Sequence, residues 1–314
     1  MADIKKIATR ESYGNALSEL GKEYDIVVLD ADLSKSTKTD TFKKTYPERF
    51  INMGIAEQNM MSTAAGLASC GKVVFASSFA MFAAGRAFEQ IRNSICYPNL
   101  NVKIGATHAG ISVGEDGATH QCLEDIGIMR TIPNMVVINP ADDVEARAAV
   151  KAAILHDGPV YLRFGRLAVP VLYDESDYKF EIGKGVLLRD GTDVSIVATG
   201  LMVEPALEAC DMLAKEGISA RVINIHTIKP IDRDILAKAA KETGAVVTCE
   251  EHNVIGGLGS AVAEVLCEEA PVPMERVGVK DTFGKSGVPA QLLKDYGLTS
   301  EDICKAAKKV ISKK

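Results

Sequence analysis

Short apolar runs, rich in β-branched residues, alternate along the chain with longer segments of helical periodicity. In the first half these runs are nearly continuous, which is typical of strands in a parallel sheet that helices cover on both faces. We therefore expect strands at residues 26–29, 73–76, 102–106, 135–138 and 160–164. The expected helices are 11–24, 57–69, 84–96 and 144–156.

The pattern stops in the middle of the chain and then resumes. Residues 171–185 are rich in acidic residues and show no sustained periodicity, so we interpret them as a linker. Beyond them we expect strands at 194–198, 220–225, 245–250 and 275–279, and helices at 204–216, 232–243, 260–269 and 300–311. The sequence thus predicts an α/β protein with two consecutive domains, 1–170 and 186–314, each a mostly parallel sheet flanked by helices.

Composition and charge exclude several classes of function. The net charge is −6 and the pI is near 5.5, which argues against a nucleic-acid-binding protein because no basic face dominates. The longest uncharged apolar stretch, 73–85, is too short to span a bilayer, so no membrane association is expected. The seven dispersed cysteines contain no CxxC pair, and the first residues lack the apolar core of a signal peptide. We expect a cytoplasmic protein that binds no metal through its own residues.

The most distinctive polar segment is the stretch 107–121, which reads THAGISVGEDGATHQ. It follows an expected strand, and open parallel sheets bind ligands at the carboxyl ends of their strands. His108 and His120 lie near its two ends, with Asp116 between them, so it could present donors and acceptors to a polyhydroxylated substrate. A polar surface loop with turn glycines would have the same composition, and both interpretations stay open at this point.

Two further segments suggest a site for a flat heterocycle. Glu57 lies at the start of an expected helix, where the helix dipole favours a carboxylate, so it either stabilises the helix or faces a ligand. Phe79 and Phe82 are three residues apart in a chain with only 5% aromatic residues. They either pack in the core or form an aromatic platform.

Other candidates carry positive charge or small polar groups. Arg163 ends an expected strand, Arg10 precedes the first helix, and Asp32 and Ser36 follow the first strand. Arginines at strand ends suit a phosphate because the guanidinium can donate two parallel hydrogen bonds. The glycine-rich turn 256–260 enters a helix but does not fit the dinucleotide-binding fingerprint, which favours a structural helix entry.

In order along nearly the whole chain, these segments resemble the transketolase family. Glu57 lies in a setting similar to the family's G-x-x-E-x-x-M motif, and Phe79 and Phe82 resemble its F-x-x-F motif. The 107–121 stretch resembles the family's T-H-D-S-I-G-x-G-E-D-G-P-T-H-Q segment. The sequence departs from these patterns at Ala109 and Gly110 (usually D-S), at Ala118 (usually proline) and at Gly85 (usually a third aromatic residue).

The E-D-G-x-T-H-Q match, with His108 upstream, favours transketolase over two related groups of thiamine diphosphate enzymes. These are deoxyxylulose-phosphate synthase and the β subunits of 2-oxo acid dehydrogenases. Both remain alternatives, as does a non-catalytic regulatory paralogue that kept the fold.

The resemblance implies the pyrimidine-binding domain followed by the C-terminal domain of a transketolase, with thiamine diphosphate as cofactor. The family's G-D-G…N motif, which holds the diphosphate and Mg²⁺ (or Ca²⁺), does not occur in the sequence. The resemblance therefore implies a split enzyme whose separate N-terminal subunit carries that motif. We expect self-association into a heterotetramer and transfer of a two-carbon ketol unit between sugar phosphates.

The same resemblance implies a role for each candidate residue. Glu57 would hydrogen-bond the aminopyrimidine of the cofactor, Phe79 and Phe82 would form its walls, and Asp32 would be a further cofactor contact. His108 and His120 would act with Glu57 in catalysis by donating to substrate oxygens, and Asp116 would bind a sugar hydroxyl. The phosphate end of the substrate would contact Arg10, Ser36, His108 and Arg163.

Overall fold

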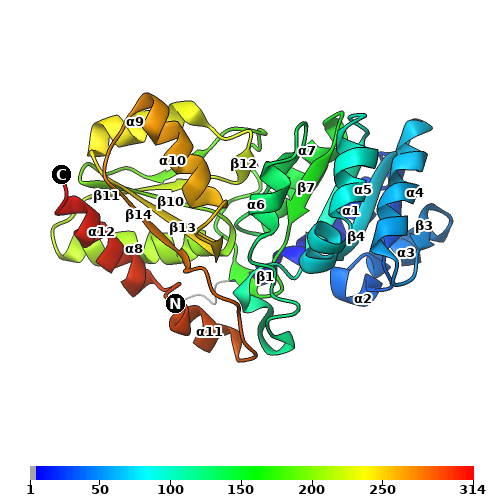
Figure 1. Ribbon diagram of the computed structural model, residues 1–314, viewed down its shortest axis with the longest axis horizontal. Helices are drawn as coiled ribbons and strands as arrows, with labels where there is room; N and C mark the ends of the chain where they lie inside the picture. The colour runs from blue at the N-terminus through cyan, green and yellow to red at the C-terminus, as the bar shows by residue number, and fades with distance from the viewer. Residues whose placement is uncertain (1–4) are drawn as a thin grey trace.

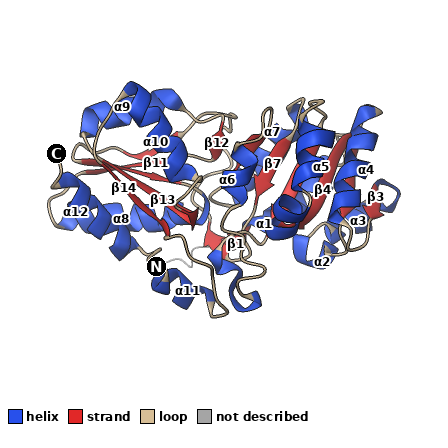
Figure 2. Cartoon of the chain, in the orientation of Figure 1, coloured by secondary structure: helices blue, strands red, loops and turns tan. Residues whose placement is uncertain are grey.

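The computed structural model describes residues 5–314 and shows two α/β units side by side (Figure 1). In each unit the strands form a central layer with helices on both sides (Figure 2). The expected fold class, two consecutive mostly parallel sheets flanked by helices, is therefore confirmed. Residues 171–185, expected to link the units, contain neither a helix nor a strand.

The first unit is built on a seven-stranded sheet in the order β12-β6-β7-β5-β4-β2-β3. All its neighbouring strands are parallel except β12 and β6, which pair antiparallel. Every strand expected in the first half is present, with ends displaced by three residues or fewer. The strands are β2 (Ile26–Asp30), β3 (Phe50–Asn52), β4 (Val73–Phe79), β5 (Val102–Thr107), β6 (Val136–Ile138), β7 (Val160–Arg163) and β12 (Thr227–Lys229).

Two groups of helices cover this sheet. On one face α1 (Thr9–Leu20) and α7 (Asp143–Leu155) pack together over a core that includes Tyr13 and Phe75. A second core lies beneath α4 (Glu57–Ser69) and α6 (Asp125–Arg130). The remaining short elements are α2 (Ser34–Thr37), α3 (Asp40–Thr45) and the 3-10 turn Pro47–Arg49, with β1 (Lys6–Ala8) and β8 (Ala168–Pro170) paired antiparallel outside the sheet.

The helix expected at 84–96 differs from its prediction. The chain forms two π-helical turns, Met81–Arg86 and Ile91–Cys96, separated by the short α5 (Phe88–Gln90). π-Helical turns are frequent at functional sites because they shift the side chains that follow them. Here the first turn places the guanidinium of Arg86 over the ring of Phe82, 4.9 Å from its centroid.

The second unit has a five-stranded sheet in the order β14-β13-β10-β11-β9, in which only the edge strand β9 is antiparallel. Its strands are β9 (Val186–Arg189), β10 (Val194–Ala198), β11 (Ala220–Asn224), β13 (Val246–Asn253) and β14 (Met274–Val279). α8 packs against α12, and α9 packs against α10. The helices are α8 (Val203–Lys215), preceded by the 3-10 turn Gly200–Met202, α9 (Arg233–Thr243), α10 (Leu258–Glu269), α11 (Pro289–Asp295) and α12 (Ser300–Ile311).

The two units share a core. Figure 1 shows α6 at their junction, where its buried Ile126 and Met129 belong to the same apolar cluster as Ile225 and Leu258 of the second unit. β12 lies between β11 and α9 in the chain, among the elements of the second unit. It nevertheless extends the sheet of the first unit. Within residues 5–314, no helix has the length and apolar character needed to cross a membrane.

Candidate functional site

The candidate residues of the first unit gather at one edge of its sheet. Phe79 is the last residue of β4, His108 follows β5, and Asp32 follows β2. These strands are parallel neighbours, so their carboxyl ends meet at the same edge, where open α/β sheets bind ligands.

Four predicted residues form an aromatic wall at this edge. The rings of Phe79 and His108 stack with centroids 3.8 Å apart, and the rings of Phe79 and Phe82 are nearly parallel at 6.0 Å. His120 presents its edge to Phe82 at a centroid distance of 5.3 Å. The structure therefore brings together aromatic side chains that the sequence places in two separate segments.

Glu57 is buried at the start of α4, with only 1% of its side chain exposed. Its Oε1 accepts a hydrogen bond from Ser78 Oγ at 3.4 Å, and its Oε2 lies 2.7 Å from Nη1 of Arg86. Because the half-exposed Arg86 also covers Phe82, it connects the carboxylate to the aromatic wall. Arg86 was not among the predicted site residues, although it is the charged residue that follows the apolar stretch 73–85.

His108 is a neutral imidazole whose tautomer follows from its neighbours. Its Nε2 lies 2.9 Å from Arg10 Nη1, and its Nδ1 lies 2.9 Å from Thr107 Oγ1. A guanidinium only donates, so Nε2 must accept, and the proton is on Nδ1, which donates to Thr107. Burial, together with the charges of Arg10 and Arg166, lowers the pKa of His108 to about 3. In this arrangement the expected donation from His108 to a substrate is replaced by donation from Arg10 to His108.

Arg10 joins two of the predicted phosphate contacts. Its Nη1 also donates to the backbone carbonyl of Ser36 at 3.1 Å, so Arg10, Ser36 and His108 lie together. Arg166 adds a second positive charge to this region, since its charge lowers the pKa of both Arg10 and His108. Arg166 donates to Glu115 Oε2 at 3.0 Å, and it was not among the predicted site residues, unlike Arg163 three residues earlier.

Arg163 has a different place from the one expected. Its side chain is only 4% exposed, and its Nε donates to Asp125 Oδ2 at 2.9 Å. Its Nη2 donates to the backbone carbonyl of Glu251, also at 2.9 Å. The guanidinium therefore serves a buried ion pair at the junction of the two units, and its contact with a substrate phosphate stays a prediction.

The two predicted aspartates lie on the surface of this chain. Asp32 is exposed, with a φ of 65°, and its Oδ1 accepts a hydrogen bond from Asn52 Nδ2 at 2.8 Å. Asp116 is exposed at the end of the 3-10 helix Ile111–Asp116. Neither belongs to the aromatic wall, so a role for either in binding requires a ligand or partner that reaches it.

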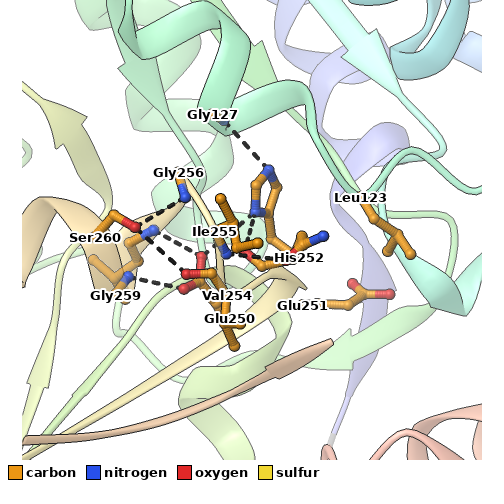
Figure 3. Close-up of polar contacts among 12 residues, drawn as sticks. Leu123, Gly127, Glu250, Glu251, His252, Val254, Ile255, Gly256, Gly259 and Ser260 are labelled. Atoms are coloured by element: carbon orange, nitrogen blue, oxygen red, sulfur yellow. Dashed lines mark hydrogen bonds and ion pairs between the residues drawn. The ribbon is translucent and has the colours of Figure 1, made fainter. Parts of the chain in front are cut away.

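The glycine-rich turn 256–260 is a structural helix entry, in agreement with the interpretation that the sequence favours. Figure 3 shows Glu250 beneath it, where its carboxylate oxygens accept hydrogen bonds from Leu258 N at 2.7 Å and Gly259 N at 2.8 Å. The first amides of α10 are thus satisfied by the chain itself and not offered to an anion. Burial raises the pKa of Glu250 to about 7.

Comparison with known proteins gives the same assignment for both units. Residues 5–171 match the family described as the pyrimidine binding domain of transketolase, and residues 183–303 match the transketolase C-terminal domain. Among residues 5–314, no three histidine, cysteine, aspartate or glutamate side chains gather closely enough to hold a metal ion.

Two curated relatives match over almost their whole length. The putative transketolase C-terminal section of Methanocaldococcus jannaschii is 54% identical over 94% of both chains. The 6-deoxy-6-sulfo-D-fructose transketolase subunit SqwH of a Clostridium species is 46% identical over 97% of this chain and 95% of its own.

A solved structure described as a split gene transketolase, inactive β4 tetramer, superposes with a TM-score of 0.92 at 60% identity. The superposition covers 98% of this chain and 99% of the chain in that structure. With the motifs, the fold and both family matches in agreement, the chain belongs to the transketolase family, of which it carries the pyrimidine-binding domain followed by the C-terminal domain.

Proposed function

We propose that this chain is the C-terminal subunit of a split, thiamine diphosphate-dependent transketolase. In this proposal it acts with a separate N-terminal subunit to transfer a two-carbon ketol unit from a ketose phosphate to an aldose phosphate. The observation that carries the proposal is the buried carboxylate of Glu57 beside the wall of Phe79, Phe82, His108 and His120.

The residues at this edge fit the aminopyrimidine of thiamine diphosphate. A flat heterocycle with a ring nitrogen needs aromatic surface and one buried acceptor or proton-sharing group, and Phe79, Phe82 and Glu57 provide both. When bound, the cofactor would supply the nucleophilic carbon that attacks the ketose carbonyl and then holds the electrons of the broken bond. Glu57 would share a proton with the pyrimidine ring nitrogen, and Asp32 would be a further contact at the same strand end.

The basic group beside the wall fits the anionic end of the substrate. The charges of Arg10 and Arg166 both act on neutral His108, and the Nε of Arg10 is buried without a partner among the described residues. His108 would orient Arg10 by accepting its Nη1–H, and Ser36 would fix the same guanidinium through its carbonyl. His120 and Asp116 would then contact the sugar hydroxyls, with His120 placed by its edge contact to Phe82.

The comparisons support a partner subunit. One relative is described as a C-terminal section and another as a subunit, while the similar solved structure is an inactive tetramer of β chains. In this proposal the N-terminal subunit binds the diphosphate and Mg²⁺ (or Ca²⁺), and two copies of each chain form a heterotetramer. The enzyme would serve the pentose phosphate pathway in the cytoplasm.

The class of anion on the substrate is the part of the proposal with a competing candidate. The Clostridium relative is named for a sulfosugar, and a guanidinium pair such as Arg10 and Arg166 binds a sulfonate through the same donors as a phosphate. We propose phosphate because it carries more negative charge to match two arginines. Rates measured with phosphorylated and sulfonated ketoses decide between them.

The decisive experiment is reconstitution. The chain is mixed with a candidate N-terminal subunit, thiamine diphosphate and Mg²⁺, and two-carbon transfer is followed between a ketose phosphate and an aldose phosphate. We expect activity only when both polypeptides are present. Full turnover by this chain alone would contradict the proposal, and so would thiamine-dependent activity that releases CO₂ from a 2-oxo acid in place of ketol transfer.

A further inference from the structure

The 108–121 loop has a backbone conformation that depends on its glycines. Gly110, Gly114 and Gly117 have φ values of 87°, 85° and 74°, in the left-handed region that favours glycine. Glycine-rich segments lose more conformational freedom on folding than others, so contacts from outside add to the loop's own hydrogen bonds, such as Gly117 N to the Gly114 carbonyl, in fixing its conformation. This loop carries His108, Asp116 and His120, and its conformation therefore determines where these groups lie.

A buried contact comes from Glu251 on β13 of the second unit. Its side chain is buried, and its Oε1 accepts a hydrogen bond from Ser112 N at 2.6 Å. Gly110 lies directly against the same carboxylate, because a Cβ built at that position would be 2.3 Å from Glu251 Cδ. The departure from the family's serine at position 110 is thus matched by the carboxylate that occupies the space.

Further contacts from the second unit support the same loop. Gln121 Nε2 donates to the carbonyl of Lys285 at 2.9 Å. A Cβ at Gly117 would be 2.6 Å from Ser286 Oγ, and one at Gly114 would be 3.0 Å from Pro289, the first residue of α11. The loop is therefore packed against the second unit along much of its length, and Glu251 is the ionisable group in that contact.

We propose that Glu251 is a positioning residue: a carboxylate of the C-terminal domain that holds the 108–121 loop in the conformation in which His120 and Asp116 meet a sugar substrate. This rests on the proposed function and extends it. The wall residues belong to the pyrimidine-binding domain, whereas their geometry depends on a side chain from the other domain.

The neighbouring glutamate provides a matched control. Glu250 and Glu251 are both buried on β13, and both accept hydrogen bonds from backbone amides. Figure 3 shows that they point to different places: Glu250 lies beneath Gly259 at the start of α10, and Glu251 points away from that turn. Glu250 thus supports its own domain, and only Glu251 reaches the loop.

Two substitutions separate the reach of the Glu251 side chain from its charge. Glu251→Asp keeps the charge but withdraws the acceptor by one methylene, whereas Glu251→Gln keeps the reach and one acceptor oxygen. We expect amide hydrogen exchange in peptides covering 108–121 of the full chain to rise in Glu251→Asp and to stay near wild type in Glu251→Gln. Glu250→Asp should raise exchange around residues 257–259 and leave the loop unchanged. Wild-type exchange of the loop in Glu251→Asp would overturn the proposal.

Kinetics of the reconstituted enzyme test the consequence for the site. Glu251→Asp should raise KM for the sugar substrates roughly tenfold with a smaller change in kcat. Glu251→Gln, which keeps the acceptor, should have a KM close to that of the wild type. If KM in Glu251→Asp equals that of Glu250→Asp, the positioning role is excluded. If the wild-type complex transfers no ketol unit, the proposed function fails, and the exchange experiment still decides whether Glu251 holds the loop.

Discussion

Arg86 and Glu57 form an ion pair, with Nη1 2.7 Å from Oε2, in which the carboxylate is buried and the guanidinium is half-exposed. The carboxylate that we propose for the aminopyrimidine thus already has a partner from its own chain on Oε2. Among residues 5–314, Oε1 accepts only the 3.4 Å hydrogen bond from Ser78, so it is the oxygen with room for a second strong partner.

Replacing Arg86 should weaken the chain without cofactor more than the assembled enzyme. Arg86→Ala leaves the buried carboxylate unpaired, which we expect to lower the free energy of unfolding by about 1–3 kcal/mol in urea titrations of the chain alone. With the partner subunit and cofactor bound, the loss in melting temperature should shrink because Glu57 gains another partner. Arg92→Ala is the control, since Arg92 hydrogen-bonds only its exposed neighbour Asn93 among the contacts of the described chain. Equal losses in both states would show that Arg86 stays on Glu57.

Glu57→Gln should separate catalysis from stability. Glutamine keeps an acceptor oxygen for Arg86 but cannot share a proton with a pyrimidine nitrogen as a carboxyl group does. In the reconstituted enzyme kcat should fall by at least about 100-fold, with the fold retained. Hydrogen–deuterium exchange at C2 of bound thiamine diphosphate, followed by NMR without any sugar, measures the proton transfer directly. Wild-type exchange in the variant would remove Glu57 from that role, and Glu89→Gln, at an exposed glutamate, controls for the loss of charge.

Arg10 and Arg163 should respond differently to replacement. Arg10→Ala should raise KM for a phosphorylated acceptor far more than for its unphosphorylated analogue, by roughly tenfold or more, because a charge-assisted hydrogen bond is lost. Arg163→Ala should instead lower the free energy of unfolding by about 3–5 kcal/mol, because it leaves buried Asp125 without its cation. Steady-state kinetics with both acceptors and urea unfolding of both variants test this pair. A selective KM effect for Arg163→Ala, with stability intact, would return that residue to the phosphate site.

His226 should make the chain less stable in acid. Burial lowers the pKa of its imidazole to about 4, and its ring lies on Phe180 with a centroid distance of 4.2 Å. The unfolded chain takes up a proton near pH 6.5 that the folded chain does not accept until about pH 4, so this group lowers stability as pH falls between those values. Between pH 7.5 and 5 the wild type should lose about 1–2 kcal/mol relative to His226→Gln, measured by urea unfolding at each pH. A difference that does not change with pH would show that the pKa of His226 is the same in the folded and the unfolded chain.

The sequence predicted the long elements well because their signal is local. The parallel strands are continuous apolar runs, and α4 and α12 begin and end at the predicted residues. β3, β9 and β12 were missed because strands of only three or four residues have no periodicity of their own and depend on a distant partner. The 84–96 helix was predicted as regular, since periodicity alone does not reveal that a segment with Gly85 in it becomes π-helical.

The site was predictable where residue type and spacing carry the information. Phe79, Phe82, His108 and His120 were selected from their segments, and the structure brings them together. The position of Arg86 and the buried ion pair of Arg163 were not predicted, for one physical reason. An arginine's role depends on which carboxylate it meets, and Asp125 and Glu57 are 38 and 29 residues away in sequence.

The strand β12 limits how the two domains can be exchanged. Thr227–Lys229 comes from the second half of the chain but pairs with Val136–Ile138, so a fragment cut within 171–185 would leave β6 as a bare sheet edge. Bare edges recruit strands from other molecules and promote aggregation. In a chimera of this pyrimidine-binding domain with a relative's C-terminal domain, the relative must therefore supply a strand that pairs with β6. The segment that can be exchanged between proteins is larger than either domain.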